Sequence, residues 1–302
     1  MNIVKNKNIF FLISLLVIIP GMISLFLWGL NRSIDFAGGS RVTFLFPKKV
    51  NQATQNTINA VFAQDKQKIA TLQTSETRVV IRTSPMDQKK NAKILSDLHQ
   101  RIGDFKEEEF ATIGPTIGAE TTNNAIQGVL LASILIVLYI AFSFREVPKP
   151  ARSWHFGVCA IIALLHDALV VLGVFSLLGH FFGVEIDSLF VTAILTVIGF
   201  SVHDTIVVFD RIRENLKKTG LRLSFASIVN QSMLQTMTRS LNTSLTVILV
   251  LTTLLIFGGE SIRWFIVALL IGVISGTYSS IFNASLLLVV WHEWNEKRVK
   301  KI

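Results

Sequence analysis

The sequence predicts an all-α membrane bundle of six transmembrane helices, with one α+β domain inserted between the first and second helix. Charged residues make up only 16% of the chain, against about 25% in soluble domains. The apolar residues gather in runs of about twenty, the length that crosses a hydrocarbon core ~30 Å thick. The long segment 31–124 lacks such a run. The six apolar runs cover residues 9–30, 125–143, 155–178, 189–209, 241–258 and 263–291.

The first run and the tail before it form the predicted segment 1–30. It follows Lys5 and Lys7, as the apolar region of a signal peptide follows its basic start. The run is too long for such a region, and no small-residue cleavage site comes after it. We therefore expect a retained helix, kinked at Pro20 in its middle.

Residues 31–124 form the only sizeable domain outside the predicted spans. Alternating apolar residues predict strands in it, and apolar residues at helical spacing predict helices. In chain order the predicted elements are a strand at 41–46, a helix at 51–62, strands at 68–72 and 77–81, a helix at 87–102 and a strand at 109–113. The order β-α-β-β-α-β is that of the ferredoxin-like fold.

The positions of the basic residues predict the topology. Lys and Arg gather in both terminal tails and in the loops after the second and fourth runs, whereas the loops near 181–188 and 259–262 have none. Short basic loops stay in the cytoplasm. We therefore expect both termini, the loop 210–240 and the basic tail of the segment 125–302 to be cytoplasmic, and the domain 31–124 to lie outside. This placement explains the net charge of +9 without a nucleic-acid partner.

The segment between the fourth and fifth runs is amphipathic. Phe225, Ile228, Val229 and Met233 recur at helical spacing, with polar residues between them. A helix lying on the cytoplasmic membrane surface explains this pattern. A connector packed against the membrane helices explains it equally well.

Acidic residues inside apolar runs are the main candidates for function, because an isolated acid at a helix centre costs about 2.5–3.5 kcal/mol. Two qualify, Asp167 in the third run and Asp204 in the fourth. Asp204 lies about 7–8 Å inside the expected cytoplasmic end of its helix, within reach of Arg239. Pairing with a cation favours a carboxylate and burial favours the protonated acid, so these two residues are a candidate proton switch. The alternatives are a static polar contact for Asp204 and a snorkelling flank residue for Arg239.

A histidine precedes each acid. His166 and Asp167 project about 100° apart on a helix, so they cannot both face one partner. They fit a proton relay and interhelical hydrogen bonds equally well. His203 stands directly before Asp204. No metal-ligand spacing joins these histidines and acids, so we expect no metal site.

Other motifs are expected to be structural. Asp210 and Arg211 belong to a charged cluster typical of a solvated helix end. Gly272 and Gly276 form a G-x-x-x-G, which permits close helix packing. Two turn-forming segments lie at the two ends of the domain 31–124, and neither has the pattern of a phosphate-binding loop. One contains Asp35, Phe36, Gly38 and Gly39, and the other contains Gly114, Pro115 and Gly118.

Taken together, these segments resemble the SecD/SecF family of protein-export membrane proteins and, within it, the SecF subunits. The matching motifs cover nearly the whole chain in one order. They are SIDFAGGS at 33–40, IGPTIG at 113–118, IGFSVHDT at 198–205, VFDRIREN at 208–215, RSLNTS at 239–244 (with Asn242) and GTYSSIF at 276–282. One departure is His203, where the family usually has asparagine. It leaves the role of Asp204 intact and is expected to alter its hydrogen bonding and pH response.

The resemblance implies a function. SecF pairs with SecD in a complex akin to the resistance-nodulation-division superfamily. That complex associates with SecYEG and YajC, acts after ATP-driven pushing by SecA, and uses the proton motive force to move preproteins across the bacterial inner membrane. In the family, residues matching Asp204 and Arg239 belong to the proton pathway, so protons are the expected coupling ion, with no cofactor and no enzymatic activity. Two alternatives stay open: a proton-coupled half-transporter for small molecules, and a structural partner of SecD that conducts no protons.

Overall fold

The structure is a computed structural model that describes residues 2–145, 147–148, 153–219 and 222–299. By its contacts the chain forms two compact units. The helical bundle comprises residues 1–30, 128–184 and 189–302, and the sheet domain comprises residues 31–127 together with 185–188. Lys149 and Arg152 of the predicted basic loop and Lys300 and Lys301 of the predicted basic tail lie outside the described residues.

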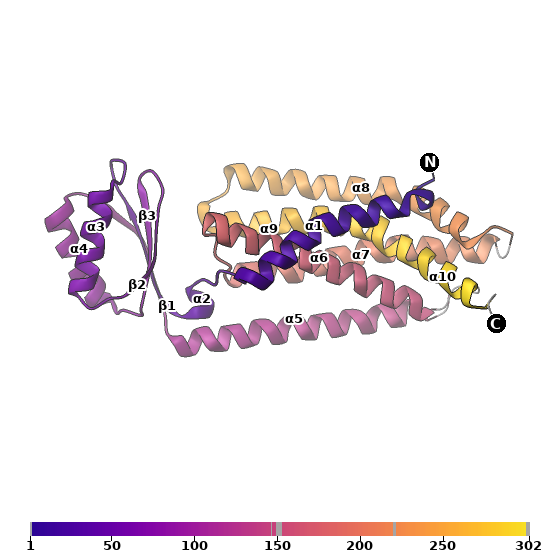
Figure 1. The fold of residues 1–302 in the computed structure, drawn as a ribbon, viewed down its shortest axis with the longest axis horizontal. Helices are drawn as coiled ribbons and strands as arrows, with labels where there is room; N and C mark the ends of the chain where they lie inside the picture. The colour runs from indigo at the N-terminus through magenta and orange to yellow at the C-terminus, as the bar shows by residue number, and fades with distance from the viewer. Residues whose placement is uncertain (1, 146, 149–152, 220–221, 300–302) are drawn as a thin grey trace. The chain divides into compact units, whose positions relative to one another are not determined.

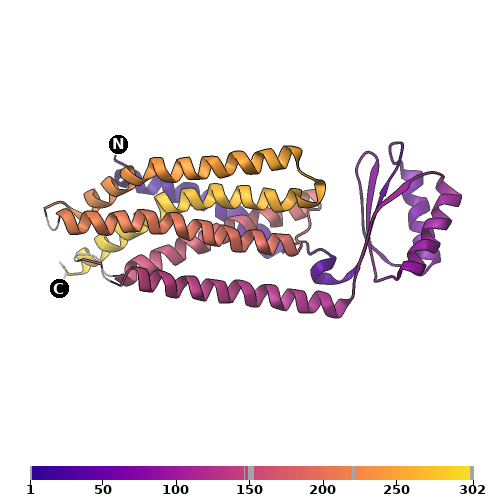
Figure 2. The same cartoon turned by 180° about the vertical axis from the view of Figure 1, so that it is seen from behind.

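Among the described residues, six helical stretches are long and apolar enough to cross a membrane, as predicted. The sixth stretch is interrupted by a π-helical turn, Ser279–Ala284. The helix α1 begins and α10 ends at the same end of the bundle (Figures 1 and 2). The helices are α1 (Lys7–Trp28), α5 (Pro115–Ser143), α6 (Ser153–Phe182), α7 (Ser188–Thr219), α8 (Phe225–Phe257), α9 (Arg263–Tyr278) and α10 (Ser285–Val299).

Two of these helices begin well before the apolar runs that predict them. Helix α5 begins at Pro115, a residue suited to the first helical position because its missing N–H has no partner there in any case. Helix α8 begins at Phe225, and the side chain of Ser224 caps it by accepting a hydrogen bond from the Ser227 amide at 3.3 Å. Hydropathy identifies only the part of a helix that suits the bilayer core, whereas the backbone hydrogen bonds continue through polar sequence.

The amphipathic segment is the first part of α8 and not a separate surface helix. Phe225, Ile228, Val229 and Met233 are buried in the main hydrophobic core of the bundle. The connector interpretation is therefore confirmed, and the membrane-surface interpretation is wrong. The apolar side chains of this stretch face protein, which removes the reason for them to lie on lipid.

Helices α1 and α6 cross at a pair of glycines. A Cβ atom added to Gly173 would lie 2.6 Å from the Cα atom of Gly21, so the two backbones are in direct contact. On one side of this crossing, the hydroxyls of Ser24 and Ser176 are 2.7 Å apart. Because Gly21 and Gly173 carry no side chains, α1 packs directly on α6.

The sheet domain follows the predicted order β-α-β-β-α-β. Its four strands form an antiparallel sheet in the order β2-β3-β1-β4. Figure 1 shows both helices on one face of this sheet. Residues such as Phe44, Ile81 and Leu98 fill the core between them. The elements are β1 (Gly39–Leu45), α3 (Gln52–Gln64), β2 (Ile69–Thr74), β3 (Arg78–Thr83), α4 (Gln88–Ile102) and β4 (Lys106–Ile113), preceded by the short helix α2 (Ile34–Ala37).

Candidate functional site

Asp167 on α6 is the centre of a buried polar cluster in the helical bundle. Its side chain is 1% exposed. The Oδ2 atom accepts hydrogen bonds from the hydroxyls of Ser201 and Ser279, both at 2.5 Å. The Oδ1 atom accepts one from Ser275 at 2.7 Å and lies 3.0 Å from His166 Nδ1. Asp167 thus joins α6 to α7, α9 and the π-helical turn, which confirms the interhelical hydrogen bonds; the relay function of His166 and Asp167 stays a prediction.

Further hydrogen bonds next to this cluster involve Ser280 of the π-helical turn. The Ser280 hydroxyl donates to the backbone carbonyl of Ser201 at 2.9 Å. It also accepts a hydrogen bond from the Thr205 hydroxyl at 2.9 Å. The Ser201 side chain donates a hydrogen bond to Asp167, and Thr205 directly follows Asp204 in α7. These bonds join α7 to the π-helical turn and end at Thr205, the neighbour of Asp204 in the sequence. A π-helical turn is often found at a functional site.

Asp204 is equally buried but has few partners. It is 2% exposed. His203 Nδ1 lies 3.7 Å from its Oδ1 atom, and the His203 side chain is otherwise 71% exposed. The Oδ2 atom of Asp204 is buried without a hydrogen-bond partner. Asp204 is thus a buried acid with one oxygen atom available for a proton or a new partner.

The predicted ion pair between Asp204 and Arg239 is not present in this structure, and Arg239 is exposed. The physical reason is its position around α8. The buried stripe of that helix runs through Thr236, Ser240 and Ser244. Arg239 lies about 60° from Thr236, 100° from Ser240 and 140° from Ser244 around the helix axis. Asn242 lies about 160° from Ser240 around the helix axis and is also exposed.

The two glycines of the G-x-x-x-G bring α9 close to α7. A Cβ atom at Gly276 would lie 3.1 Å from the Cβ atom of Ser201, and one at Gly272 would clash with Val197. This close approach brings the hydroxyls of α7 and of the π-helical turn to one carboxylate. The predicted packing function of both glycines is therefore confirmed, and it also serves the polar cluster.

The charged cluster at the far end of α7 is separate from the buried acids. Arg211 bonds Glu214 at 2.5 Å and Gln235 at 2.7 Å, and Asp210 pairs with Arg213 at 2.5 Å. The Asp210 side chain is 56% exposed. These contacts are those of a solvated helix end, as predicted.

The two glycine-containing segments pack against each other at the base of the sheet domain. Gly38 has φ +70°, and a Cβ atom there would lie 2.9 Å from the Cα atom of Pro115. A Cβ atom at Gly118 would lie 2.8 Å from the Gly38 nitrogen and 3.1 Å from the Phe36 carbonyl oxygen. Gly39 has φ +120° and lies against the backbone of β3, while Gly114 precedes Pro115 with open space around it. Both segments therefore need glycine for backbone contact.

Asp35 and Glu185 hold the segment Glu185–Ser188 in the sheet domain. The Oδ2 atom of Asp35 accepts hydrogen bonds from the amide of Ser188 at 2.9 Å and from its hydroxyl at 2.8 Å. Arg82 on β3 pairs with Glu185 at 2.9 Å, with side chains 12% and 17% exposed. Burial raises the pKa of the Glu185 carboxyl above its ordinary value, while the charges of Arg82 and Arg41 oppose the rise and Asp187 adds to it.

This raised pKa predicts a stability change with pH. The folded protein holds the Glu185 proton more tightly than the unfolded chain does, so the contribution of Glu185 to the free energy of unfolding should be fully present below the unfolded pKa of about 4.3. It should be lost as the pH rises through the folded pKa. Thermal unfolding of the detergent-solubilised protein across this range would measure it. The stability of the protein relative to Glu185→Gln should increase as the pH falls, and a constant difference would contradict the prediction.

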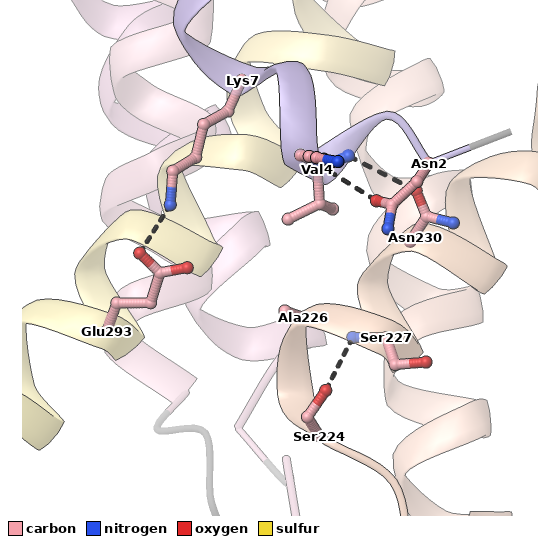
Figure 3. A pocket seen from close by; sticks show the side chains of 9 residues that line it. Asn2, Val4, Lys7, Ser224, Ala226, Ser227, Asn230 and Glu293 are labelled. Atoms are coloured by element: carbon pink, nitrogen blue, oxygen red, sulfur yellow. Dashed lines mark hydrogen bonds and ion pairs between the residues drawn. The ribbon is translucent and has the colours of Figure 1, made fainter.

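A small cavity of about 350 Å³ lies near the start of α1 and α8, apart from the buried acids. Figure 3 shows that its polar groups bond to one another. Lys7 pairs with Glu293 at 2.5 Å, and the Asn230 side chain accepts from the amides of Ile3 and Val4 at 2.8 Å and 3.4 Å. These contacts attach the N-terminal turn to α8 and α10.

The sequence indicated the two acids but missed the hydroxyl groups around them. Ser201, Ser275, Ser279, Ser280 and Thr205 are uncharged and common in membrane helices, so none stands out by residue type. The available signal was spacing, because Ser275 and Ser279 are four residues apart and lie on one helix face.

Comparisons with known proteins agree on one family. Residues 93–294 match the family model described as "Protein export membrane protein SecD/SecF, C-terminal". The chain is 51% identical to the protein translocase subunit SecF of Thermobaculum terrenum, over 99% of this chain and 96% of that protein. It is 35% identical to the protein translocase subunit SecDF of Bacillus subtilis, over 98% of this chain but 38% of that protein. The crystal structure of SecDF from Thermus thermophilus matches with a TM-score of 0.83 and 32% identity, over 96% of this chain and 38% of that one.

Proposed function

Because the chain belongs to the SecD/SecF family of protein-export membrane proteins, we propose that it is the SecF subunit of a complex that uses the proton motive force to promote preprotein movement across the bacterial inner membrane. The sheet domain is then a ferredoxin-like domain on the outer side, and both termini are cytoplasmic. Protons are the coupling ion, with no further cofactor and no enzymatic reaction.

The proposed partner is SecD, supplied as a separate chain. The chain spans only 38% of the SecDF proteins of Bacillus subtilis and Thermus thermophilus. The remaining part of those proteins is what a separate SecD would provide. SecYEG, YajC and SecA are the further partners that the family resemblance suggests, and unfolded preproteins are the substrate.

The pair of buried acids, one surrounded by hydroxyl donors and one with an unpartnered oxygen atom, is the observation that best supports proton coupling. Three hydroxyl groups donate hydrogen bonds to the Asp167 carboxyl group. The Oδ2 atom of Asp204 has no hydrogen-bond partner, so it is free to gain one.

Replacing Asp204 with asparagine tests this proposal. The amide has nearly the same shape but cannot take up and release a proton, so we expect preprotein export and proton conductance to fall to the level of a strain without the subunit. Export of a secreted reporter and proton flux into membrane vesicles measure the two effects. Glu296→Gln, on an exposed side chain of α10, is the control.

Two outcomes would favour other functions. Normal export and normal proton conductance in Asp204→Asn, at normal protein level, would support a structural partner of SecD. Loss of proton conductance with unchanged preprotein export would support a transporter for other molecules.

A further inference from the structure

Residues 183–187 connect α6 to α7, yet the segment Glu185–Ser188, which ends at the first residue of α7, belongs to the sheet domain. By contacts they group with residues 31–127 and not with the bundle that contains both helices. The Ile186 amide donates to the Asn31 carbonyl at 2.8 Å, and the Ser33 amide donates to the Ile186 carbonyl at 2.9 Å. Arg32 and Ile186 form a parallel bridge. Most of the short connection between α6 and α7 is thus held in the sheet domain by backbone hydrogen bonds.

Side chains strengthen this attachment at both ends of the segment. At one end is the largely buried ion pair of Arg82 and Glu185. At the other, Asp35 binds both the amide and the hydroxyl of Ser188, the first residue of α7. We call Arg82, Asp35 and Glu185–Ser188 the clasp. A connection between helices needs neither interaction, and burying an ion pair has a desolvation cost.

The two helices joined by this segment carry the buried polar cluster. Helix α6 supplies Asp167, and α7 supplies Ser201 and Asp204. A change in protonation that breaks the bond between Ser201 and Asp167 alters how α6 and α7 pack. Because helices are stiff, a shift of α7 along its axis also displaces Ser188 at its first turn. The clasp then passes this displacement to β3 through Arg82 and to the start of the sheet domain through Asp35.

We propose that Arg82, Glu185 and Asp35 are positioning residues that couple proton uptake in the bundle to movement of the sheet domain. This inference rests on the proposed function, because it assumes that Asp167 and Asp204 change protonation. It adds which residues carry the coupling. A clasp that only stabilises the fold would affect all activities together, whereas a coupling clasp affects export separately from proton flux.

The experiment measures export and proton flux side by side in membranes that contain the full chain and its SecD partner. In Glu185→Gln and Arg82→Gln we expect export to fall about tenfold, a coupling effect within the usual range, while proton flux and protein level stay near normal. The exchange Arg82→Glu with Glu185→Arg should recover export relative to either charge-reversing single variant. Arg78→Gln is the matched control, because Arg78 also extends from β3 but pairs with Glu108 on β4.

The results separate this inference from the proposed function. Normal export in Glu185→Gln and Arg82→Gln overturns the coupling function of the clasp, as does a parallel fall of export, flux and protein level. Failure of the exchanged pair to recover export also counts against it. Asp204→Asn in the same membranes should lose both activities. If Asp204→Asn keeps both, the proposed function fails whatever the clasp variants show.

Discussion

Replacing Asp167 with alanine is expected to destabilise the bundle, whereas replacing it with asparagine is expected to leave the fold intact and stop export. Alanine removes the acceptor shared by Ser201, Ser275 and Ser279. Ser279 has a second acceptor, the Gly276 carbonyl at 3.2 Å, so two buried donors lose their partner. At about 1–3 kcal/mol for each, the cost is about 2–6 kcal/mol.

Asparagine keeps one acceptor oxygen and the side-chain shape, so two serines keep or reorient their bonds at small cost. It cannot exchange a proton. Thermal unfolding in detergent and the amount of subunit in membranes measure the first effect, and export of a secreted reporter measures the second. Equal stability of the alanine variant and the unmodified chain would show that the hydroxyls do not depend on the carboxylate. Normal export in the asparagine variant would exclude Asp167 from the proton pathway.

A single methyl group at Gly173 is expected to separate α1 from α6. The Cβ atom of alanine would lie 2.6 Å from the Cα atom of Gly21 and 3.0 Å from its carbonyl carbon. Both neighbours are backbone atoms, so no side-chain rotation relieves the clash and a helix must move. Overpacking of this kind costs about 1–3 kcal/mol. The hydrogen bond between Ser24 and Ser176 would be lost with the displacement.

Gly157→Ala is the matched control for this prediction. Gly157 lies in the same helix, and a Cβ atom there meets nothing within 4 Å. Alanine also has the better helix propensity, by about 1 kcal/mol, so this variant should be at least as stable as the unmodified chain. Unfolding temperature in detergent distinguishes the two. If Gly173→Ala is as stable as Gly157→Ala, the backbone contact between α1 and α6 does not contribute to assembly.

Sequence patterns predicted the elements well where one physical rule acts along the chain. Apolar runs indicated six spans, because a bilayer core demands a continuous apolar surface of fixed length. Alternation and helical spacing indicated the β-α-β-β-α-β order. Boundaries were less accurate where a helix leaves the membrane, as at Pro115 and Phe225, because backbone hydrogen bonds do not require apolar side chains.

For the candidate site, the sequence by itself indicated the residues whose burial in a membrane helix costs free energy. An acid in an apolar run needs a reason, and this identified Asp167 and Asp204. The partners were decided only by the tertiary structure. The sequence favoured Arg239 as the partner of Asp204 by its distance from the helix end, but its angle around α8 places it at the surface. Three serines on α7, α9 and the π-helical turn reach Asp167 because Gly272 and Gly276 let the helices approach.

The sequence alone thus determined a six-span chain, its inserted α+β domain, its family and its two buried acids. Each of these is expressed in composition, spacing or motif along one dimension. Only the tertiary structure decided that Asp167 is the hydrogen-bonded centre, that Asp204 has an unpartnered oxygen, and that Glu185–Ser188 belongs to the sheet domain. These contacts join residues far apart in the chain, and their geometry depends on helix rotation and backbone packing, which no local pattern encodes.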